Sequence, residues 1–194
     1  MQQIFSTNAS PSEYQKLGKT FPFPDLTGNL CVKCRKTRLT RHGFYERFLI
    51  AKDFQGYIHI KRFICLKCGK TVSLLPWFCH PSREFSVEFI HCMLVGLLDW
   101  AGSVNSFIYS FTYRYGVMFS RQLLYQYRKR INNNCNRILM ELTRQFGLQS
   151  PVSAENGQQK RVKDALNIIE TKAPSPCHVS MNMFSHGFCT YLTL

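Results

Sequence analysis

The residues with the clearest potential for chemistry are two pairs of cysteines with the same spacing. Cys31 and Cys34 form the first pair, in CVKC, and Cys65 and Cys68 form the second, in CLKC. A gap of two residues lets a tight turn direct both sulfur atoms at one point, and two such turns supply the four thiolates of a tetrahedral site. We therefore predict a closed structural zinc site, although a thiolate tetrahedron also accepts iron.

Two other interpretations of these cysteines stay open. One is a dithiol redox centre, but two separate pairs with basic flanks lack the strand–helix surroundings of such a motif; the other is a chance spacing. A catalytic zinc ion needs an open coordination position, and four thiolates leave none, so we expect no chemistry at the metal. His42, His59 and His80 could each replace a thiolate, but none has the spacing of a knuckle.

The residue after each pair bears on the turn geometry, and the remaining cysteines bear on the redox compartment. Gly69 follows the second pair directly, where such a turn often needs a positive φ, whereas Arg35 follows the first pair and departs from this pattern. An odd total of 9 cysteines and an N-terminus unlike a signal peptide predict a reducing, cytoplasmic compartment. We expect small buried thiols at the solitary positions, Cys79, Cys92, Cys135, Cys177 and Cys189.

The 30 residues between the pairs are predicted to form β-structure. TRLTR, FYERFLI and YIHIKRFI carry alternating, β-branched or aromatic residues, KTVSLL follows the second pair, and a turn is predicted at 53–56. Short strands closed by four cysteines predict a zinc ribbon over 28–78. Such a unit is too small to be stable by burial alone, so we expect the metal to supply much of its folding free energy and Cys65→Ser to unfold it.

The pattern changes to helical after the ribbon. Phe85, Phe89, Met93 and Leu97 lie four residues apart, as on the apolar face of an amphipathic helix. A second helix is predicted over 103–115, ending at Gly116, and a third begins after Ser120, with three asparagines at 132–134 as a point where it could break. The predicted class is α+β, in four parts: an N-terminal arm (1–27), a zinc ribbon (28–78), a helical domain (82–147) and a linker-like, poorly ordered tail (148–194).

The net charge of +14 is concentrated in the cysteine-containing segment. Residues 31–83 hold 12 basic and 2 acidic residues, a net of +10, whereas residues 84–150 hold 7 and 4, a net of +3. A field of this sign attracts phosphates or anionic lipid; the alternative is a generically basic, soluble surface. The longest apolar stretch, 89–98, is too short to span a bilayer, which needs about 20 residues, so we expect no membrane partner.

The predicted second and third helices have the order of a helix-turn-helix motif, with a glycine-containing turn between them. In that motif the second helix enters the major groove with its N-terminus first, so Arg121 and Gln122 could read guanine and adenine. The alternative is a plain amphipathic helix with a solvated basic face. The candidate DNA contacts are Arg121, Gln122, Tyr125, Gln126, Arg128, Lys129 and Arg130 of this helix, and Arg41, Arg47, Lys61 and Arg62 of the ribbon.

Three segments carry a resemblance to a known family. CVKC, TRHGFYER and YIHIKRFICLKCGKTVSLLPWFCHPSREFSVEFI resemble the zinc-ribbon N-terminal region of bacterial insertion-sequence transposases, and also short uncharacterised bacterial proteins with the same ribbon. The resemblance covers residues 28–92. It implies DNA binding, with the four paired cysteines as zinc ligands, and a helix-turn-helix after the ribbon fits such proteins. Arg35 and the tail depart from the pattern.

The catalytic part of such transposases has no counterpart in the sequence. Their integrase-like core uses three carboxylates to hold two metal ions, whereas here Asp99 and Glu141 lie on predicted helices, and Asp164 and Glu170 lie in irregular sequence. We therefore predict a DNA-targeting module that is not an enzyme, with itself or other transposition proteins as possible partners. The alternatives are a truncated or frameshifted transposase remnant and an RNA-binding or protein-binding ribbon.

Overall fold

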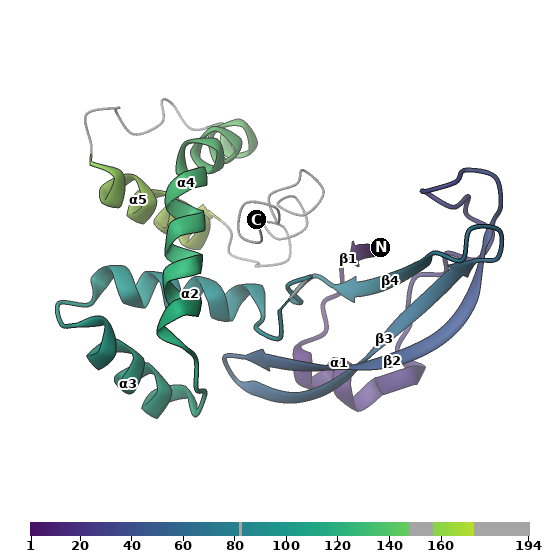
Figure 1. The fold of residues 1–194 in the computed structure, drawn as a ribbon, viewed down its shortest axis with the longest axis horizontal. Helices are drawn as coiled ribbons and strands as arrows, with labels where there is room; N and C mark the ends of the chain where they lie inside the picture. The colour runs from purple at the N-terminus through teal and green to yellow at the C-terminus, as the bar shows by residue number, and fades with distance from the viewer. Residues whose placement is uncertain (82, 148–156, 173–194) are drawn as a thin grey trace. The chain divides into compact units, whose positions relative to one another are not determined.

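A computed structural model describes residues 1–81, 83–147 and 157–172 and has the predicted α+β class (Figure 1). The chain divides into two compact units, Met1–Ser86 and Val87–Leu194. The described strands all belong to the first unit, and the long helices belong to the second. We describe each unit by itself, as unit 1 and unit 2.

Unit 1 is built on a four-stranded sheet with the strand order β1-β4-β3-β2 (Figure 1). The strands are β1 (Gln2–Phe5), β2 (Leu39–Ala51), β3 (Phe54–Cys65) and β4 (Thr71–Pro76). β2, β3 and β4 pair antiparallel, as expected for consecutive strands, whereas β1 pairs parallel with β4. The sheet thus joins the start of the chain to the strand that follows the second cysteine pair.

The hairpin of β2 and β3 differs from the prediction in two places. Ala51 pairs with Phe54, which leaves Lys52 and Asp53 as a two-residue turn, so the turn predicted at 53–56 is misplaced. The predicted runs TRLTR and FYERFLI merge into β2 through a β-bulge between Arg41 and Phe44. A bulge lets one long strand absorb an extra residue, and Gly43 provides the positive φ, 86°, that it needs here.

Residues 1–27, for which the sequence predicts only an arm, supply a large part of the core of unit 1. They form β1, helix α1 (Pro11–Leu17) and the 3-10 turn η1 (Gly18–Thr20). Tyr14 of α1 is fully buried, and its hydroxyl donates a hydrogen bond of 2.9 Å to the His59 carbonyl oxygen. Its ring contacts the rings of Phe21, Phe23 and Phe78. Unit 1 therefore has an aromatic core that does not include the paired cysteines.

The described part of unit 2 is helical, with α2 (Val87–Asp99), α3 (Val104–Tyr115), α4 (Arg121–Phe146) and α5 (Gln158–Lys172). Gly116 ends α3 in the left-handed conformation, and the Ser120 side chain caps the start of α4, which confirms both predicted boundaries.

Two features of α2 and α4 refine the predictions. Phe89, Met93 and Leu97 are buried on α2 as predicted, but Phe85 lies before this helix and forms a bridge with Ile50. α4 continues through the three asparagines at 132–134 without a break. Among the described residues, no helix is long and apolar enough to cross a bilayer.

Helix α5 lies within the segment for which the sequence predicts a linker-like tail. The predicted tail was linker-like, yet residues 158–172 form a regular helix, and only 148–156 and 173–194 of that tail lie outside the described residues. Val162, Ala165 and Leu166 are buried, and the Arg161 guanidinium donates a 3.0 Å hydrogen bond to Asn136 of α4. Asp164 and Glu170 therefore lie on a helix and not in irregular sequence.

Candidate metal centre and nucleic-acid interface

The four paired cysteines meet at one end of unit 1, where β3 ends and β2 begins. Their sulfur atoms all lie within 4.8 Å of one another, and the Sγ–Sγ distances are 3.7 Å for Cys31–Cys68 and 3.6 Å for Cys34–Cys65. Four zinc–sulfur bonds of about 2.3 Å in a tetrahedron separate the sulfurs by about 3.8 Å, whereas a disulfide is about 2.05 Å long. The cluster therefore fits a four-coordinate metal ion and is not a pair of disulfides.

The two knuckles that present these sulfurs have the same backbone geometry. The Arg35 N–H donates to the Cys31 carbonyl and the Gly69 N–H donates to the Cys65 carbonyl, each at 2.8 Å. Both donors have a positive φ, 51° for Arg35 and 66° for Gly69. Arg35 thus adopts the glycine-like conformation despite its side chain, and it is the one non-glycine residue in the described ranges that does so. The first knuckle therefore has Arg35 in place of a glycine but keeps the same turn.

The similarity of the knuckles extends to their flanking residues. CVKCRKT at 31–37 and CLKCGKT at 65–71 are identical at five of seven positions. The cysteine spacing alone does not show this repeat of seven residues, but an alignment of the two segments does. Each knuckle consequently places an aliphatic residue and two lysines at matching positions.

The backbone around the knuckles favours thiolates at the first pair. The backbone N–H groups of Cys34 and Lys33 lower the pKa of Cys31 to about 6, and the N–H of Lys36 lowers the pKa of Cys34. For Cys68, the Lys70 N–H lowers the pKa, but burial and the neighbouring sulfurs outweigh it and raise the pKa to about 11. Four thiolates this close together need a cation between them, which a divalent metal ion provides.

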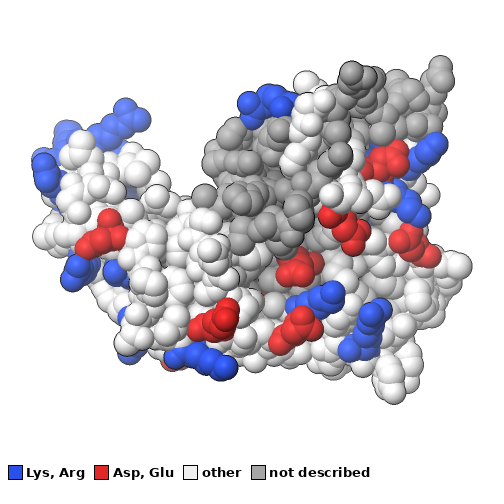
Figure 2. Space-filling model, turned by 180° about the vertical axis from the view of Figure 1, so that it is seen from behind, with Lys and Arg blue, Asp and Glu red and all other residues white. Residues whose placement is uncertain are grey.

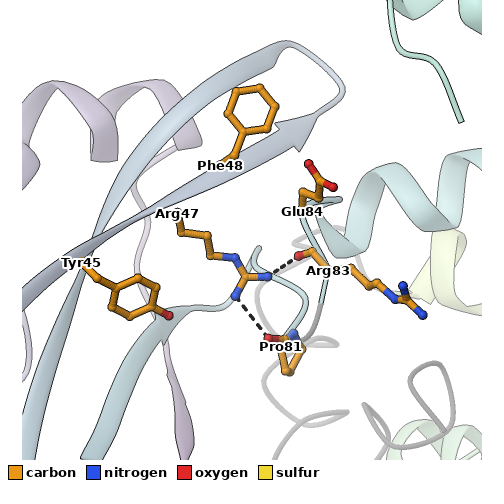
Figure 3. A pocket seen from close by; sticks show the side chains of 6 residues that line it. All are labelled: Tyr45, Arg47, Phe48, Pro81, Arg83 and Glu84. Atoms are coloured by element: carbon orange, nitrogen blue, oxygen red, sulfur yellow. Dashed lines mark hydrogen bonds between the residues drawn. The ribbon is translucent and has the colours of Figure 1, made fainter.

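Arg47 was predicted to contact DNA, but its guanidinium is used inside unit 1 (Figure 3). It donates a hydrogen bond of 3.3 Å to the Pro81 carbonyl oxygen and further hydrogen bonds to the carbonyl oxygens of His80 and Arg83. These contacts hold the loop after β4 against β2. The group lies in an open pocket of about 360 Å³, lined by Tyr45, Arg47, Phe48, Pro81, Arg83 and Glu84.

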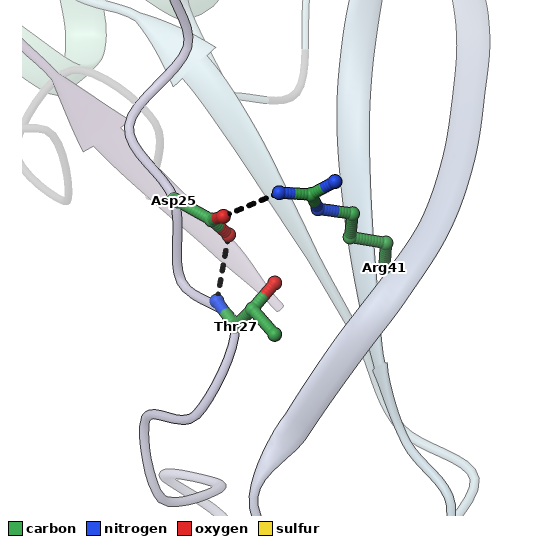
Figure 4. Close-up of polar contacts among 3 residues, drawn as sticks. All are labelled: Asp25, Thr27 and Arg41. Carbon is green, nitrogen blue, oxygen red and sulfur yellow. Dashed lines mark hydrogen bonds and ion pairs between the residues drawn. The ribbon is translucent and has the colours of Figure 1, made fainter.

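Arg41 has an acidic partner from the N-terminal segment (Figure 4). Its Nη2 donates to Asp25 Oδ2 at 2.7 Å, and the backbone N–H of Thr27 donates to Asp25 Oδ1 at 2.9 Å. Hydrogen bonds from Thr27 and Arg41 hold the pKa of Asp25 well below its usual range. The Arg41 charge is therefore offset by a carboxylate, although its side chain remains largely exposed.

The other two ribbon residues predicted to contact DNA lie over aromatic rings. The Lys61 ammonium is 5.5 Å from the ring centroid of Phe23 and 5.4 Å from that of Phe63. The Arg62 guanidinium is 5.5 Å from the ring centroid of Tyr45. Cation–π contacts of this kind stabilise the folded unit. All four ribbon cations that were predicted to contact DNA thus have a partner inside unit 1.

The ribbon has a second set of cations at the knuckle end, which sequence reasoning missed. We call residues 28–38 and 65–70 the ribbon tip; they contain six basic and no acidic residues. All six basic side chains are exposed, and Figure 2 shows Lys and Arg side chains gathered at this end of unit 1, at the upper left. Charge counted separately for each turn, rather than for the whole ribbon, would have found them. They are Lys33, Arg35, Lys36, Arg38, Lys67 and Lys70.

In unit 2, the start of α4 presents five of its seven predicted DNA-contacting side chains on one exposed face. Leu124, Tyr127 and Ile131 are buried on its opposite face. The Arg121 guanidinium donates to the Tyr125 hydroxyl at 3.0 Å and lies 5.3 Å from the centroid of that ring. Arg128 and Arg130 are half-buried, whereas the exposed residues are Arg121, Gln122, Tyr125, Gln126 and Lys129.

Comparisons with protein-family models, curated proteins and solved structures find no match for this chain.

Proposed function

We propose that this protein binds duplex DNA, with a structural zinc ion in the ribbon and with the start of α4 reading bases. The observation that carries the proposal is the exposed face of α4, where Arg121, Gln122 and Gln126 follow a capped helix start. α3, the turn from Gly116 to Ser120 and α4 succeed one another in helix-turn-helix order. In this arrangement the N-terminal residues of the second helix contact base edges.

The chemistry of the face suits base reading. Arg121 can donate two hydrogen bonds to guanine and Gln122 can pair with adenine through its amide, each contact discriminating by about 1–3 kcal/mol. The hydrogen bond and ring contact from Tyr125 restrict the Arg121 side chain before binding, which lowers the entropy lost when it meets a base. Lys129, two turns into the helix, suits a phosphate contact.

Zinc has a structural role in this proposal. Cys31, Cys34, Cys65 and Cys68 would hold the ion, which when bound supplies a cross-link between the two knuckles and no reactive position. Of the carboxylates that could have served a metal-dependent nuclease, Asp99 forms an ion pair with Lys163 of α5. The closed thiolate site supports a structural metal ion in a DNA-targeting module.

The test is a selection from a random duplex library with the zinc-loaded full chain, followed by competition between enriched and scrambled duplexes. We expect Arg121→Ala to relax the preference at one base position and to leave the fold intact. Lys129→Ala, the control in the same helix, should weaken binding to all sequences equally. A library with no enriched site, or an Arg121→Ala variant that loses affinity without any change in preference, would contradict base reading by α4.

A duplex RNA of matched length is the competitor that separates DNA from RNA recognition. The deep, narrow major groove of A-form RNA does not admit a helix, so we expect RNA to compete only weakly and without sequence preference. RNA that displaced the enriched DNA at equal concentration would favour an RNA-binding ribbon.

A further inference from the structure

The ribbon tip holds six exposed cations that unit 1 does not use. Within the described ranges, none of them forms an ion pair, a side-chain hydrogen bond or a cation–π contact. Arg41 and Arg47, in contrast, have polar partners, and Lys61 and Arg62 lie over aromatic rings. Exposed like charges on two adjacent turns repel one another and lower the stability of the unit. Their accumulation at one place therefore calls for an anionic counterpart.

The metal centre accounts for only part of this charge. A zinc ion with four thiolates carries two negative charges, which offset two of the six cations and leave the tip strongly positive. The metal site also does not explain why aliphatic side chains are exposed beside these cations. The remaining charge, and the exposed aliphatic side chains that precede two of the lysines, point to an external ligand.

Two aliphatic side chains lie among these cations at matching positions of the repeat. Val32 is 59% exposed and Leu66 is 72% exposed, and each directly precedes a lysine, Lys33 and Lys67. A single exposed aliphatic residue is ordinary, but these two occupy the same place in both knuckles. The tip thus presents two exposed aliphatic side chains, each followed directly by an exposed lysine.

We propose that the ribbon tip is a second DNA contact, which enters the minor groove with Val32 and Leu66 and binds the flanking phosphates through its lysines. The proposal rests on the proposed function, because it requires a chain that binds duplex DNA. The minor groove has walls of deoxyribose between two rows of phosphates, and proteins that bind there combine cations with small apolar wedges. The pattern of the tip is complementary to that groove.

An anionic membrane shares part of this chemistry, but the tip suits it less well. Even a single myristoyl chain gives only marginal membrane binding. Val32 and Leu66 together offer fewer methylene groups than such a chain, so their insertion would hold the protein on a bilayer only weakly. Vesicles are therefore included as an arm of the test.

The experiment compares two triple variants of the zinc-loaded full chain with equal net charge. Lys33, Lys67 and Lys70 are replaced by Gln in the tip variant, and Lys16, Lys19 and Lys52, also exposed in unit 1, are replaced in the control. Fluorescence anisotropy on random duplex DNA across a salt series gives the slope of log affinity against log salt. We expect the tip variant to reduce the slope by about two to three, at about 0.9 per phosphate contact, and the control to leave it unchanged.

The apolar pair is tested separately with Val32→Ser/Leu66→Ser, using Leu17→Ser as the exposed control. We expect the double variant to lose about tenfold in affinity with an unchanged salt slope, and netropsin, a minor-groove ligand, to abolish the difference from wild type on A·T-rich duplex. Zinc content equal to wild type shows that the knuckles are intact in every variant.

The outcomes separate this inference from the proposed function. Equal slopes for the tip variant and its control, with the α4-dependent preference retained, would overturn the tip contact alone. Binding to phosphatidylserine vesicles that depends on Val32 and Leu66, without an effect on DNA, would overturn it in favour of a membrane. A wild-type chain that binds no duplex at low salt would overturn the proposed function first.

Discussion

The ribbon tip and the rest of unit 1, which we call the ribbon body, are both basic, but they use their charge in opposite ways. In the body, Arg47 holds a loop through three carbonyl oxygens and Lys61 lies over two aromatic rings. In the tip, the lysines and arginines point to solvent. A net charge of +10 over 31–83 therefore overstates the charge available to a ligand, because several of these cations already have partners.

The two regions also differ in what holds them together. The body buries Tyr14, Ile58, Ile60, Phe63 and Phe78, whereas in the tip the buried side chains are mainly those of Cys31 and Cys65. The sequence predicts a ribbon over 28–78 that depends on its metal as a whole. Because residues 1–27 complete an aromatic core in the body, we now expect this dependence to be confined to the tip.

Removal of the metal ion is expected to have the largest effect, and to act on the tip and not on the body. Structural zinc contributes on the order of 10 kcal/mol to small metal-bound folds, and chelation or Cys65→Ser removes it. We expect backbone amide NMR to show loss of dispersed signals for the tip, with those of Ile58 and Ile60 retained. Collapse of all unit 1 signals would show that the body has no independent stability.

The aromatic core of the body is tested by Tyr14→Ala. This substitution removes a fully buried ring and its hydrogen bond to His59, so we expect the free energy of unfolding to fall by about 3–5 kcal/mol in denaturant titrations. Tyr113→Ala is the matched control, because that ring is 88% exposed and its loss should change stability by less than about 0.5 kcal/mol. Equal losses of unfolding free energy in the two variants would show that Tyr14 is not a core residue of unit 1.

Substitution of one arginine in each region distinguishes a cation that stabilises the fold from a cation that binds DNA. Arg47→Met leaves three carbonyl oxygens without their donor, and we expect it to lower the free energy of unfolding by about 2 kcal/mol while the salt slope of DNA binding stays the same. Arg38→Met in the tip should do the reverse, with little change in stability and a lower slope. The assignment of roles would be wrong if Arg47→Met altered the slope more than Arg38→Met did.

The smallest expected effects concern the two knuckle turns. Gly69→Ala forces a Cβ into the left-handed conformation and should cost about 1 kcal/mol of unfolding free energy. Arg35→Gly relieves the same strain but makes the unfolded chain more flexible, so we expect a gain of less than about 1 kcal/mol. Denaturant titration of the zinc-loaded chain measures both, and a stabilising Gly69→Ala would contradict the shared turn geometry.

The predictable parts of the molecule depend on local signals. The spacing of Cys31, Cys34, Cys65 and Cys68 is enough to predict their cluster, since each knuckle is a short turn. Gly116 and Ser120 mark helix boundaries through the conformation and hydrogen bonding of single residues. In the same way, the period of Phe89, Met93 and Leu97 predicts α2.

The parts that could not be predicted depend on distant partners. β1 becomes a strand by pairing with β4, about 70 residues later, and Tyr14 becomes a core residue through contacts with His59 and Phe78. The asparagines at 132–134 do not break α4, because Ile131, Cys135 and Ile138 are buried at helical spacing around them. The partners of Arg47 and Lys61 are likewise distant in the sequence, so the sequence does not show that these cations of the body are paired.

The most direct test of the account is hydrogen–deuterium exchange of the zinc-loaded full chain with and without random duplex DNA. We expect slower exchange at the amides of the ribbon tip and of the first two turns of α4, with no change at the hairpin turn around Lys52. Bound DNA that left both regions unchanged would contradict the claim that the exposed cations of the tip and the exposed face of α4 each contact DNA.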